Sequence, residues 1–587
     1  MTDQRTDHAP WPMRAALLFG LGALSGLIVD LLIRGDAGTY WSVTDSILRL
    51  SLATFVAVAG VLFAFTLERV RWRWSLAFAL VTGAVLGAVF YWNASPEGDA
   101  PDDPWHVFAA FLAVAIAAPL FQTARDEGGR RFPYGPVHAH VWANVVLWCA
   151  AWLFVLIAWL LVQLLAQLFL LIGIELLRTL LEKSWANWML VGGALGAAIG
   201  LLRDRDRVVG VLQRVVTTIL SVLAPVLAVG LVLFELALPF TGLDTLWEQT
   251  RSTTPILLTC VFGAFILANA VIGTSREEES TVKFMRWSAM ALGAVMLPLA
   301  LVAAISTGLR IGQHGFTPAR LWAIVFVAIA IACAALYLYA LVRGRMGWAE
   351  RVRPANIRLA MGVCLIALLL ATPLVPFGAI STGSQLARLD SGEVPPAEFD
   401  WRAMRFDFGP SGVAALERLK AEGANPEMRR LATAALAAEH SFQVDTPREI
   451  RQREQARHAL VVLPAGAQLP EALSGKILTG SNCTDGETCA VLLDPGGQSA
   501  ILVTASVCSP PAVDPVVLAT CSAPVTRAFY LRDGQWAREA QTESTDAAGR
   551  ERLSRIYATL RQGQVEIRPV PRRQVFIGNE AVGEAFE

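Results

Sequence analysis

The sequence predicts a polytopic α-helical membrane bundle of about eleven transmembrane helices, followed by an extracytoplasmic α+β domain. Of its 587 residues, 55% are hydrophobic and only 17% are charged, which is more apolar than an ordinary soluble protein of this length. One uncharged stretch, residues 141–174, would form a helix about 51 Å long, whereas the hydrocarbon core of a bilayer is about 30 Å thick. Apolar windows of this kind fill residues 13–377, and residues 381–587 have the composition of a soluble domain.

Hydropathy places the crossings one after another through the first two thirds of the chain. Each apolar window is long enough to span the hydrocarbon core as a helix. The crossings are predicted at residues 14–33, 46–67, 74–92, 105–121, 142–172, 186–202, 211–237, 254–273, 285–308, 319–342 and 357–377.

Positive charge alternates between the loops and predicts the orientation, because cytoplasmic loops retain Lys and Arg. With the N-terminus in the cytoplasm, one outer loop, residues 93–104, is acidic and carries no Lys or Arg. The loops rich in arginine are then all cytoplasmic, at residues 69–73, 125–131, 203–214, 276–286 and 343–358. An odd number of crossings places the C-terminal region outside the cytoplasm.

Four cysteines of the C-terminal region point to the same compartment. Cys483 and Cys489 flank an Asp-Gly turn signal, and Cys508 and Cys521 flank a proline-rich connection. Two local disulfides are the simplest of three possible connectivities, and they imply an oxidising compartment. The alternative is four free thiols in a cytoplasmic tail.

Glycines at four-residue spacing predict close helix packing in the bundle. The sixth crossing carries Gly192, Gly196 and Gly200, and the first carries Gly22 and Gly26. Such spacing lets two helix backbones approach closely within lipid.

The predicted domains are a multi-pass transmembrane domain at residues 1–380, a helical juxtamembrane segment at 381–460 and a β-rich α+β domain at 461–587. Amphipathic patterns predict helices at 413–422, 426–439 and 447–458. From residue 459 the period approaches two, which predicts strands in VVL, AVLLD, SAILVTAS, RAFYLR and VEIRPV. A helical segment at 547–560 interrupts them.

Three stretches carry a family resemblance: FLLIGIELLRTLLEKSWANWMLVGGALGAAIGLLRDR, RIGQHGFTPARLWAI and FDWRAMRFDFG. They resemble corresponding parts of the bacterial polytopic membrane proteins catalogued as domain of unknown function 4153, and the pattern covers about residues 11–425. The resemblance implies a location in the bacterial inner membrane. It carries no catalytic residues across, because that family has no assigned function.

Ionisable residues within crossings are costly and raise a functional question. Asp30, Glu175, Glu235 and Arg310 all fall near the predicted outer face. The functional interpretation is an outward-facing polar cavity in which they bind a cation, a proton or a polar headgroup. The alternative is that these charges at helix ends reach interfacial water or pair with one another.

Other polar motifs in the crossings indicate structure rather than chemistry. His138 and His140 could begin a metal site, but no neighbouring ligand completes one, and an interfacial loop is the simpler interpretation. Gln163 and Gln167 lie one helical turn apart and could form hydrogen bonds between helices, which is a structural role. The sequence therefore predicts no metal site, no cofactor and no catalytic residue, and without a basic block it predicts no nucleic-acid partner.

Two functions remain open. One is a transporter, or a lipid- or ion-translocating bundle, that uses the outer polar residues, because eleven crossings exceed what an anchor needs. The other is a non-enzymatic membrane scaffold or sensor whose periplasmic domain binds an envelope protein. A membrane-embedded enzyme ranks third, because the crossings lack a nucleophile, a histidine cluster or paired carboxylates. Membrane lipids are the expected partners in each case.

Overall fold

A computed structural model of the chain describes residues 11, 13–35, 46–93, 104–129, 132–242, 253–446, 460–464, 466–479, 487–494, 497–506, 525–532, 534–538, 573–577 and 580–586. The chain forms two compact units. The membrane unit comprises Met1–Pro396 and Ala403–Ala437, and the C-terminal unit comprises Ala397–Arg402 and Ala438–Glu587.

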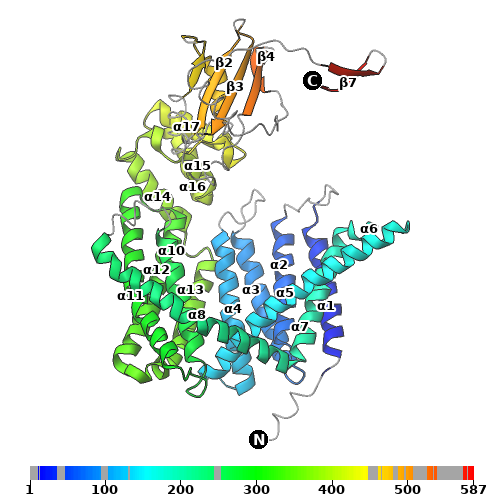
Figure 1. Ribbon diagram of the computed structural model, residues 1–587, viewed down its shortest axis with the longest axis vertical. Coiled ribbons are helices and arrows are strands. Elements are labelled where there is room, and N and C mark those ends of the chain that lie inside the picture. The colour runs from blue at the N-terminus through cyan, green and yellow to red at the C-terminus, as the bar shows by residue number, and fades with distance from the viewer. Residues whose placement is uncertain are drawn as a thin grey trace, which may run out of the picture. The chain divides into compact units, whose positions relative to one another are not determined.

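Eleven helices in the described part of the chain are long and apolar enough to cross a membrane, so this is a multi-pass membrane protein (Figure 1). Their number agrees with the eleven crossings that the sequence predicts. They are α1 (Met13–Ile33), α2 (Ile47–Thr66), α3 (Trp72–Asn93), α4 (Pro104–Glu127), α5 (Tyr134–Leu171), α7 (Ser184–Arg203), α8 (Asp206–Thr241), α10 (Thr253–Ile272), α11 (Lys283–His314), α12 (Pro318–Gly344) and α13 (Ala349–Ala371).

Helices α13 and α5 differ most from the sequence prediction, because each begins eight residues earlier than the predicted crossing. The first turns of α5 carry His138, which lies within hydrogen-bond distance of the Tyr134 hydroxyl at 2.9 Å. A prediction from hydropathy alone excludes these polar residues from the crossing. The helix includes them because their side chains form hydrogen bonds.

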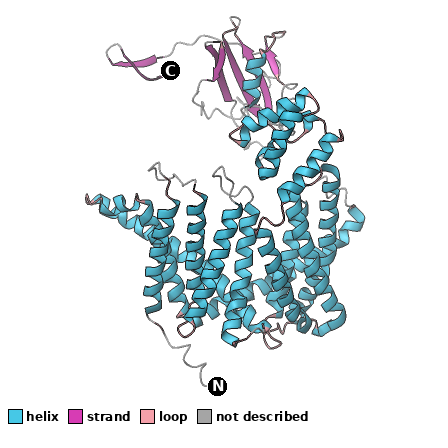
Figure 2. Cartoon of the chain, turned by 180° about the vertical axis from the view of Figure 1, so that it is seen from behind, coloured by secondary structure: helices cyan, strands magenta, loops and turns pink. Residues whose placement is uncertain are grey.

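A bend at Gly173 separates α5 from the short helix α6 (Leu176–Leu181). Gly173 has a φ of +78°, a conformation that favours glycine. After the bend, Arg178 and Glu182 form an ion pair of 3.5 Å, as the spacing of the charges predicts. In Figures 1 and 2, α6 and the end of α5 reach the lateral edge of the membrane unit.

Three apolar cores position the described helices of the membrane unit, and a smaller one packs α2, α3 and α4 around Leu62, Ala79 and Ala118. The first helical group packs α1, α2, α5 and α7 around residues such as Leu18 and Ile199. The second helical group packs α8, α10, α11 and α12 around residues such as Leu292 and Tyr337. A third core joins α3 and α4 to α12 and α13 and includes Trp322, so α4 and α13 connect the two groups.

Helices α1 and α7 approach most closely through their glycines. A Cβ atom on Gly192 would lie 2.2 Å from the Gly22 carbonyl oxygen, and one on Gly196 would lie 2.0 Å from the Leu18 carbonyl oxygen. At Gly200 the nearest atom would be the Ala15 Cα, at 2.7 Å. All three predicted packing glycines therefore lie against α1, where no side chain fits.

Helices beyond the last crossing include α14 (Phe377–Asp390), α15 (Trp401–Phe406), α16 (Gly409–Glu422) and α17 (Pro426–Ala437), with 3-10 turns at Pro396–Glu398 and Ser441–Gln443. A further 3-10 turn, Arg345–Gly347, joins α12 to α13. The two helices predicted at 413–422 and 426–439 correspond to α16 and α17. Both belong to the membrane unit. The helix predicted at 447–458 lies outside the described residues.

The C-terminal unit contains a five-stranded sheet in the order β1-β2-β3-β4-β5 (Figure 2). Its strands are β1 (Val461–Leu463), β2 (Glu487–Leu493), β3 (Ser499–Ser506), β4 (Val525–Arg532) and β5 (Gln535–Arg538), and β6 (Arg573–Ile577) pairs separately with β7 (Glu580–Phe586). Strands β1 and β2 are parallel, and the later neighbours in the sheet are antiparallel. Leu473 and Ile477 of α19 (Glu471–Thr479) belong to the same buried core as Val491, Leu502 and Phe529 of the sheet.

The period-two pattern predicts the first four of these strands, but it misses α19, β5, β6 and β7. The strand predicted in VEIRPV and the helix at 547–560 lie outside the described residues, so the α+β class of the whole region stays a prediction. Cys489 is buried on β2. No disulfide joins two described cysteines, and the other three cysteines predicted to pair lie outside the described residues.

Candidate functional site

Contacts between helix termini distinguish the two ends of the membrane unit. Arg14 at the start of α1 and Arg203 at the end of α7 both lie within ion-pair distance of Glu68, which follows α2. We call this end proximal. At the opposite, distal end, Arg34 follows α1 and binds both Asp30 and Ser184, the first residue of α7. Helix α1 therefore runs in the opposite direction to α2 and α7.

Asp30, the first of the four predicted site residues, is buried and already has a partner. Arg34, four residues further along the chain, forms an ion pair with its carboxylate and also donates to the Ser184 hydroxyl at 3.4 Å. Arg49 at the start of α2 donates to the Leu31 carbonyl at 2.9 Å. Asp30 therefore fastens the distal ends of α1 and α7 rather than facing a solute.

Glu175 and Arg310 lie on different helical groups. Glu175 is exposed directly before α6, and Arg310 is half-buried near the end of α11. Within the described ranges, no ion pair joins any two of the four predicted residues. Asp30 and Glu175 belong to the first helical group, and Glu235 and Arg310 belong to the second, so the structure divides the predicted site in two.

Glu235 differs from the other three residues, because it continues the face by which α8 packs against its group. Ala224, Ala228 and Leu231 on that face are buried, and Glu235 follows them one helical turn later. Its side chain is half-buried. Its Oε1 atom is shielded from solvent and has no hydrogen-bond partner in the part of the chain that the structure describes.

Two of the helices packed against α8, α10 and α11, also become polar in their distal turns. Thr253 and Thr254 of α10 are buried, as are Ser306 and Thr307 of α11. The hydroxyl groups of Thr254 and Thr307 lie 3.1 Å apart, whereas Ser306 Oγ has no partner among the described residues. These four residues and Glu235 form what we call the distal polar layer.

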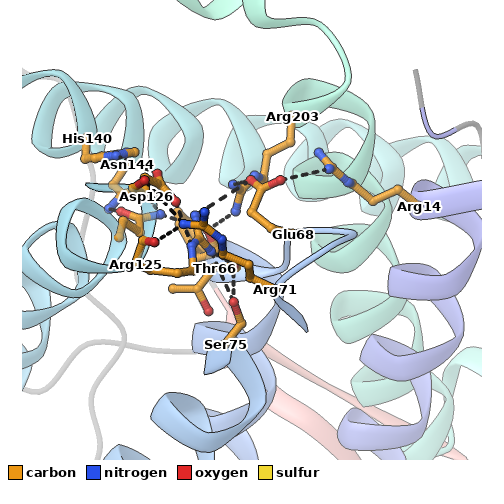
Figure 3. Close-up of polar contacts among 12 residues, drawn as sticks. Arg14, Thr66, Glu68, Arg71, Ser75, Arg125, Asp126, His140, Asn144 and Arg203 are labelled. Carbon is orange, nitrogen blue, oxygen red and sulfur yellow. Dashed lines mark hydrogen bonds and ion pairs between the residues drawn. The ribbon is translucent and has the colours of Figure 1, made fainter. Parts of the chain in front are cut away.

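A second cluster, which sequence reasoning missed, surrounds Glu68 at the proximal end (Figure 3). Arg203 of α7 lies 2.5 Å from Glu68 Oε1, Arg125 of α4 lies 3.9 Å from the same atom, and Arg14 of α1 lies 3.7 Å from Oε2. The Arg125 side chain is only 2% exposed. Three helices thus hold the segment between α2 and α3 through one carboxylate.

Arg125 of this proximal arginine cluster is also satisfied by hydrogen bonds, whereas the buried Nε atom of Arg14 has no partner among the described residues. Arg125 donates to the Thr66 carbonyl, to Ser75 Oγ at 3.1 Å and to Asp126 at 2.8 Å. Both oxygens of Glu68 face arginines, which leaves neither of them for a cation. The arrangement can lock the proximal ends of the helices together, and it offers no vacant ligand.

A third polar group lies inside the second helical group. Asn269 donates to the Tyr337 hydroxyl at 2.6 Å, this hydroxyl donates to Asn356 Oδ1 at 3.1 Å, and Asn356 donates back to Asn269 Oδ1 at 2.7 Å. The closed ring joins α10, α12 and α13. Tyr134 of α5 adds a longer bond of 3.4 Å to Asn269, so the ring also reaches the first helical group.

His138 and His140 both lie within the helix α5, so the interpretation of the pair as an interfacial loop is wrong. The two side chains have different partners. His138 Nδ1 is 2.9 Å from the Tyr134 hydroxyl, and His140 Nε2 is 3.2 Å from Asp126 of α4. Residues two apart on a helix point about 200° apart, which separates the two imidazoles. Among the described residues no group of His, Cys, Asp and Glu could hold a metal ion.

The sequence contained part of the signal for the missed clusters. Arg125 and Arg203 count toward orientation as loop charges, yet both are drawn into buried pairs that only tertiary packing reveals. Asn269 and Asn356 are single polar residues in apolar surroundings, and an inspection restricted to ionisable groups passes over them. No protein-family model matches the chain, and neither curated proteins nor solved structures give a match.

Proposed function

We propose that the protein is a transporter that moves a cation or proton across the membrane, with Glu235 as the residue that binds it. The observation that carries this proposal is the Oε1 atom of Glu235, which is shielded from solvent and lacks a hydrogen-bond partner within the described ranges. A carboxylate in the interior of a membrane protein is costly unless it binds a proton, a cation or a donor. Binding and release of such an ion would therefore change the energy of the site.

The other residues of the distal polar layer lie on α10 and α11, which pack against α8, and they support a small, hard ion. The distal polar layer offers hydroxyl oxygens on α10 and α11, and oxygen ligands suit protons and alkali or alkaline-earth cations. Ser306 Oγ, also without a partner among the described residues, is available as a ligand. Arg310 follows Ser306 by one turn of α11, where its charge would help to release a bound cation.

The test is cation-linked proton movement in proteoliposomes that contain a pH-sensitive dye. A gradient of Na⁺ or K⁺ should move protons with the wild-type protein, and Glu235→Gln should abolish the movement, because the amide cannot ionise. Glu175→Gln is the matched control, since Glu175 is exposed before α6. Equal rates for wild-type and Glu235→Gln, or for wild-type and empty liposomes, would refute the proposal.

A scaffold or sensor function is the second candidate, and the observation that favours it is the separate compact C-terminal unit with its own buried core. In this case an envelope protein would bind that unit. Deleting residues 438–587 should then abolish the cellular phenotype while Glu235→Gln leaves it unchanged. The transporter proposal expects the reverse.

We also propose the bacterial inner membrane as the location, with a cytoplasmic N-terminus, a periplasmic C-terminal unit and disulfides among Cys483, Cys489, Cys508 and Cys521. The charge alternation of the loops supports this orientation, and so does the resemblance to the domain of unknown function 4153 family. Maleimide labelling with and without reductant checks the disulfides. A reporter active only in the cytoplasm, fused after Glu587, should be inactive.

A further inference from the structure

Two glutamines on α5 lie in apolar surroundings and have no hydrogen-bond partner among the described residues. Gln163 is half-buried and Gln167 is exposed, and no hydrogen bond joins either side chain to another described residue. The neighbouring Leu160, Leu164 and Leu168 are each at least half exposed. The primary amides are therefore on a surface of the helix that would otherwise face only lipid.

Both amides lie well within the uncharged part of α5. The next charged residue is Glu175, which follows Gln167 by eight residues and lies beyond the bend at Gly173. Lipid chains offer neither donors nor acceptors, so an amide that faces them is unsatisfied unless another helix supplies a partner.

Four residues on one face of α5 have the spacing of a helix interface. Leu156, Leu160, Gln163 and Gln167 follow one another at intervals of four, three and four residues, the pattern by which two helices pack along a seam. Leu156 and Leu160 are each 52% exposed. The end of α5 also reaches the lateral edge of the membrane unit in both views (Figures 1 and 2).

We propose that this seam, Leu156, Leu160, Gln163 and Gln167, is the interface with a second copy of the same chain. A primary amide carries donors and an acceptor, so it is complementary to itself. Two copies inserted in the same orientation bring the same residues to the same depth, and a two-fold axis along the membrane normal pairs each glutamine with a glutamine. A different partner would need its own polar group at that depth. Polar residues at such positions fix the register and number of packed helices.

The full-length protein in liposomes, labelled with one fluorophore per chain, tests the proposal by photobleaching. Wild-type spots should bleach in two steps. The Gln163→Leu/Gln167→Leu double variant should dissociate at about 10-fold or more higher protein-to-lipid ratio, and Gln163→Asn/Gln167→Asn should retain most of the dimer because it keeps the amides. Leu161→Ala removes an exposed side chain from the other flank of α5 and should change nothing.

Cross-linking provides a readout that does not depend on the stability of these variants. In a Cys149→Ala background, Leu156→Cys should form a cross-linked dimer on mild oxidation, whereas Leu161→Cys should not. Single-step bleaching of the wild-type protein in lipid would overturn the proposal. So would dimers that the leucine substitutions leave unchanged, or equal cross-linking from positions 156 and 161.

Discussion

Gly192 of α7 faces Gly22 of α1 so closely that a Cβ atom on Gly192 would lie 2.2 Å from the Gly22 carbonyl oxygen. Real Cβ atoms do not approach a carbonyl oxygen to that distance, and the obstacle is backbone rather than a side chain that could rotate away. Gly192→Ala must therefore push the two helices apart. Because α1 and α7 form much of the first core, we expect a loss of about 1–3 kcal/mol in the free energy of unfolding.

Thermal unfolding in detergent measures this loss, and Gly20→Ala is the matched control on α1. A Cβ atom on Gly20 would meet nothing within 4 Å, so the substitution should leave the midpoint unchanged or raise it slightly, since Ala favours a helix over Gly. If both variants unfolded at the wild-type temperature, the close packing of α1 on α7 would be wrong.

Glu68→Gln should destabilise the proximal end more than any other removal of a single carboxylate there. The substitution leaves Arg14, Arg125 and Arg203 close together without the negative charge they share. Breaking a buried ion pair by removing one partner costs about 3–5 kcal/mol. The expected result is a large fall in the unfolding midpoint that high salt does not abolish, because buried charges are poorly screened.

Glu182→Gln is the control for this effect. Glu182 pairs with Arg178, and both side chains are exposed, Glu182 by 63% and Arg178 by 55%. Exposed ion pairs contribute about 0–1 kcal/mol to stability. If the Glu68→Gln and Glu182→Gln proteins were equally stable, the charge of Glu68 would not be needed to stabilise the three arginines at the proximal end.

The number of helices and most of their bounds follow from the sequence because membrane crossings obey one dominant requirement, an apolar stretch of sufficient length. The partners of polar residues do not follow from it. Asp30 looks equivalent to Glu235 in hydropathy, yet an arginine four residues later pairs with Asp30, whereas Glu235 continues a packing face and has no such neighbour. Arg125 looks like a loop charge until the structure brings it to Glu68 of another loop. Local periodicity predicts which residues share a helix face, and it cannot predict which helix will lie opposite.

Tyr337→Phe tests the hydrogen-bonded ring of the second helical group. The phenylalanine ring keeps the apolar contacts of a fully buried side chain, and only the hydroxyl that joins Asn269 to Asn356 is lost. The two amides still bond to each other at 2.7 Å, so we expect a moderate loss of about 1–2 kcal/mol in stability. Tyr339→Phe removes a hydroxyl from a 57% exposed side chain on the same helix and should have no measurable effect. Equal midpoints for the two variants would contradict a structural role of the ring.

Thr274 and Glu278, in the segment between α10 and α11, predict a pH dependence that can be measured. The Thr274 hydroxyl donates to Glu278 Oε2 and holds the pKa of that carboxyl below its ordinary value of 4.5, although partial burial opposes the effect. A carboxyl whose pKa is lowered by folding stabilises the protein above its unfolded pKa, and this contribution is lost as the pH falls through the folded pKa. Thr274→Val should therefore raise the pKa of Glu278 and reduce stability at neutral pH.

The effect of Thr274→Val on stability should disappear at acidic pH. Once the pH is below the lowered pKa, Glu278 is protonated in the folded protein and its ionised form no longer contributes, so the variant and wild-type unfolding curves should converge. In a Glu278→Gln background the substitution should cause no loss that depends on pH. The backbone N–H of Thr274, which donates to the same oxygen at 3.2 Å, remains in the variant, so the shift should be reduced rather than abolished. A loss of equal size at neutral and acidic pH would show that Thr274 acts through packing and not through the charge of Glu278.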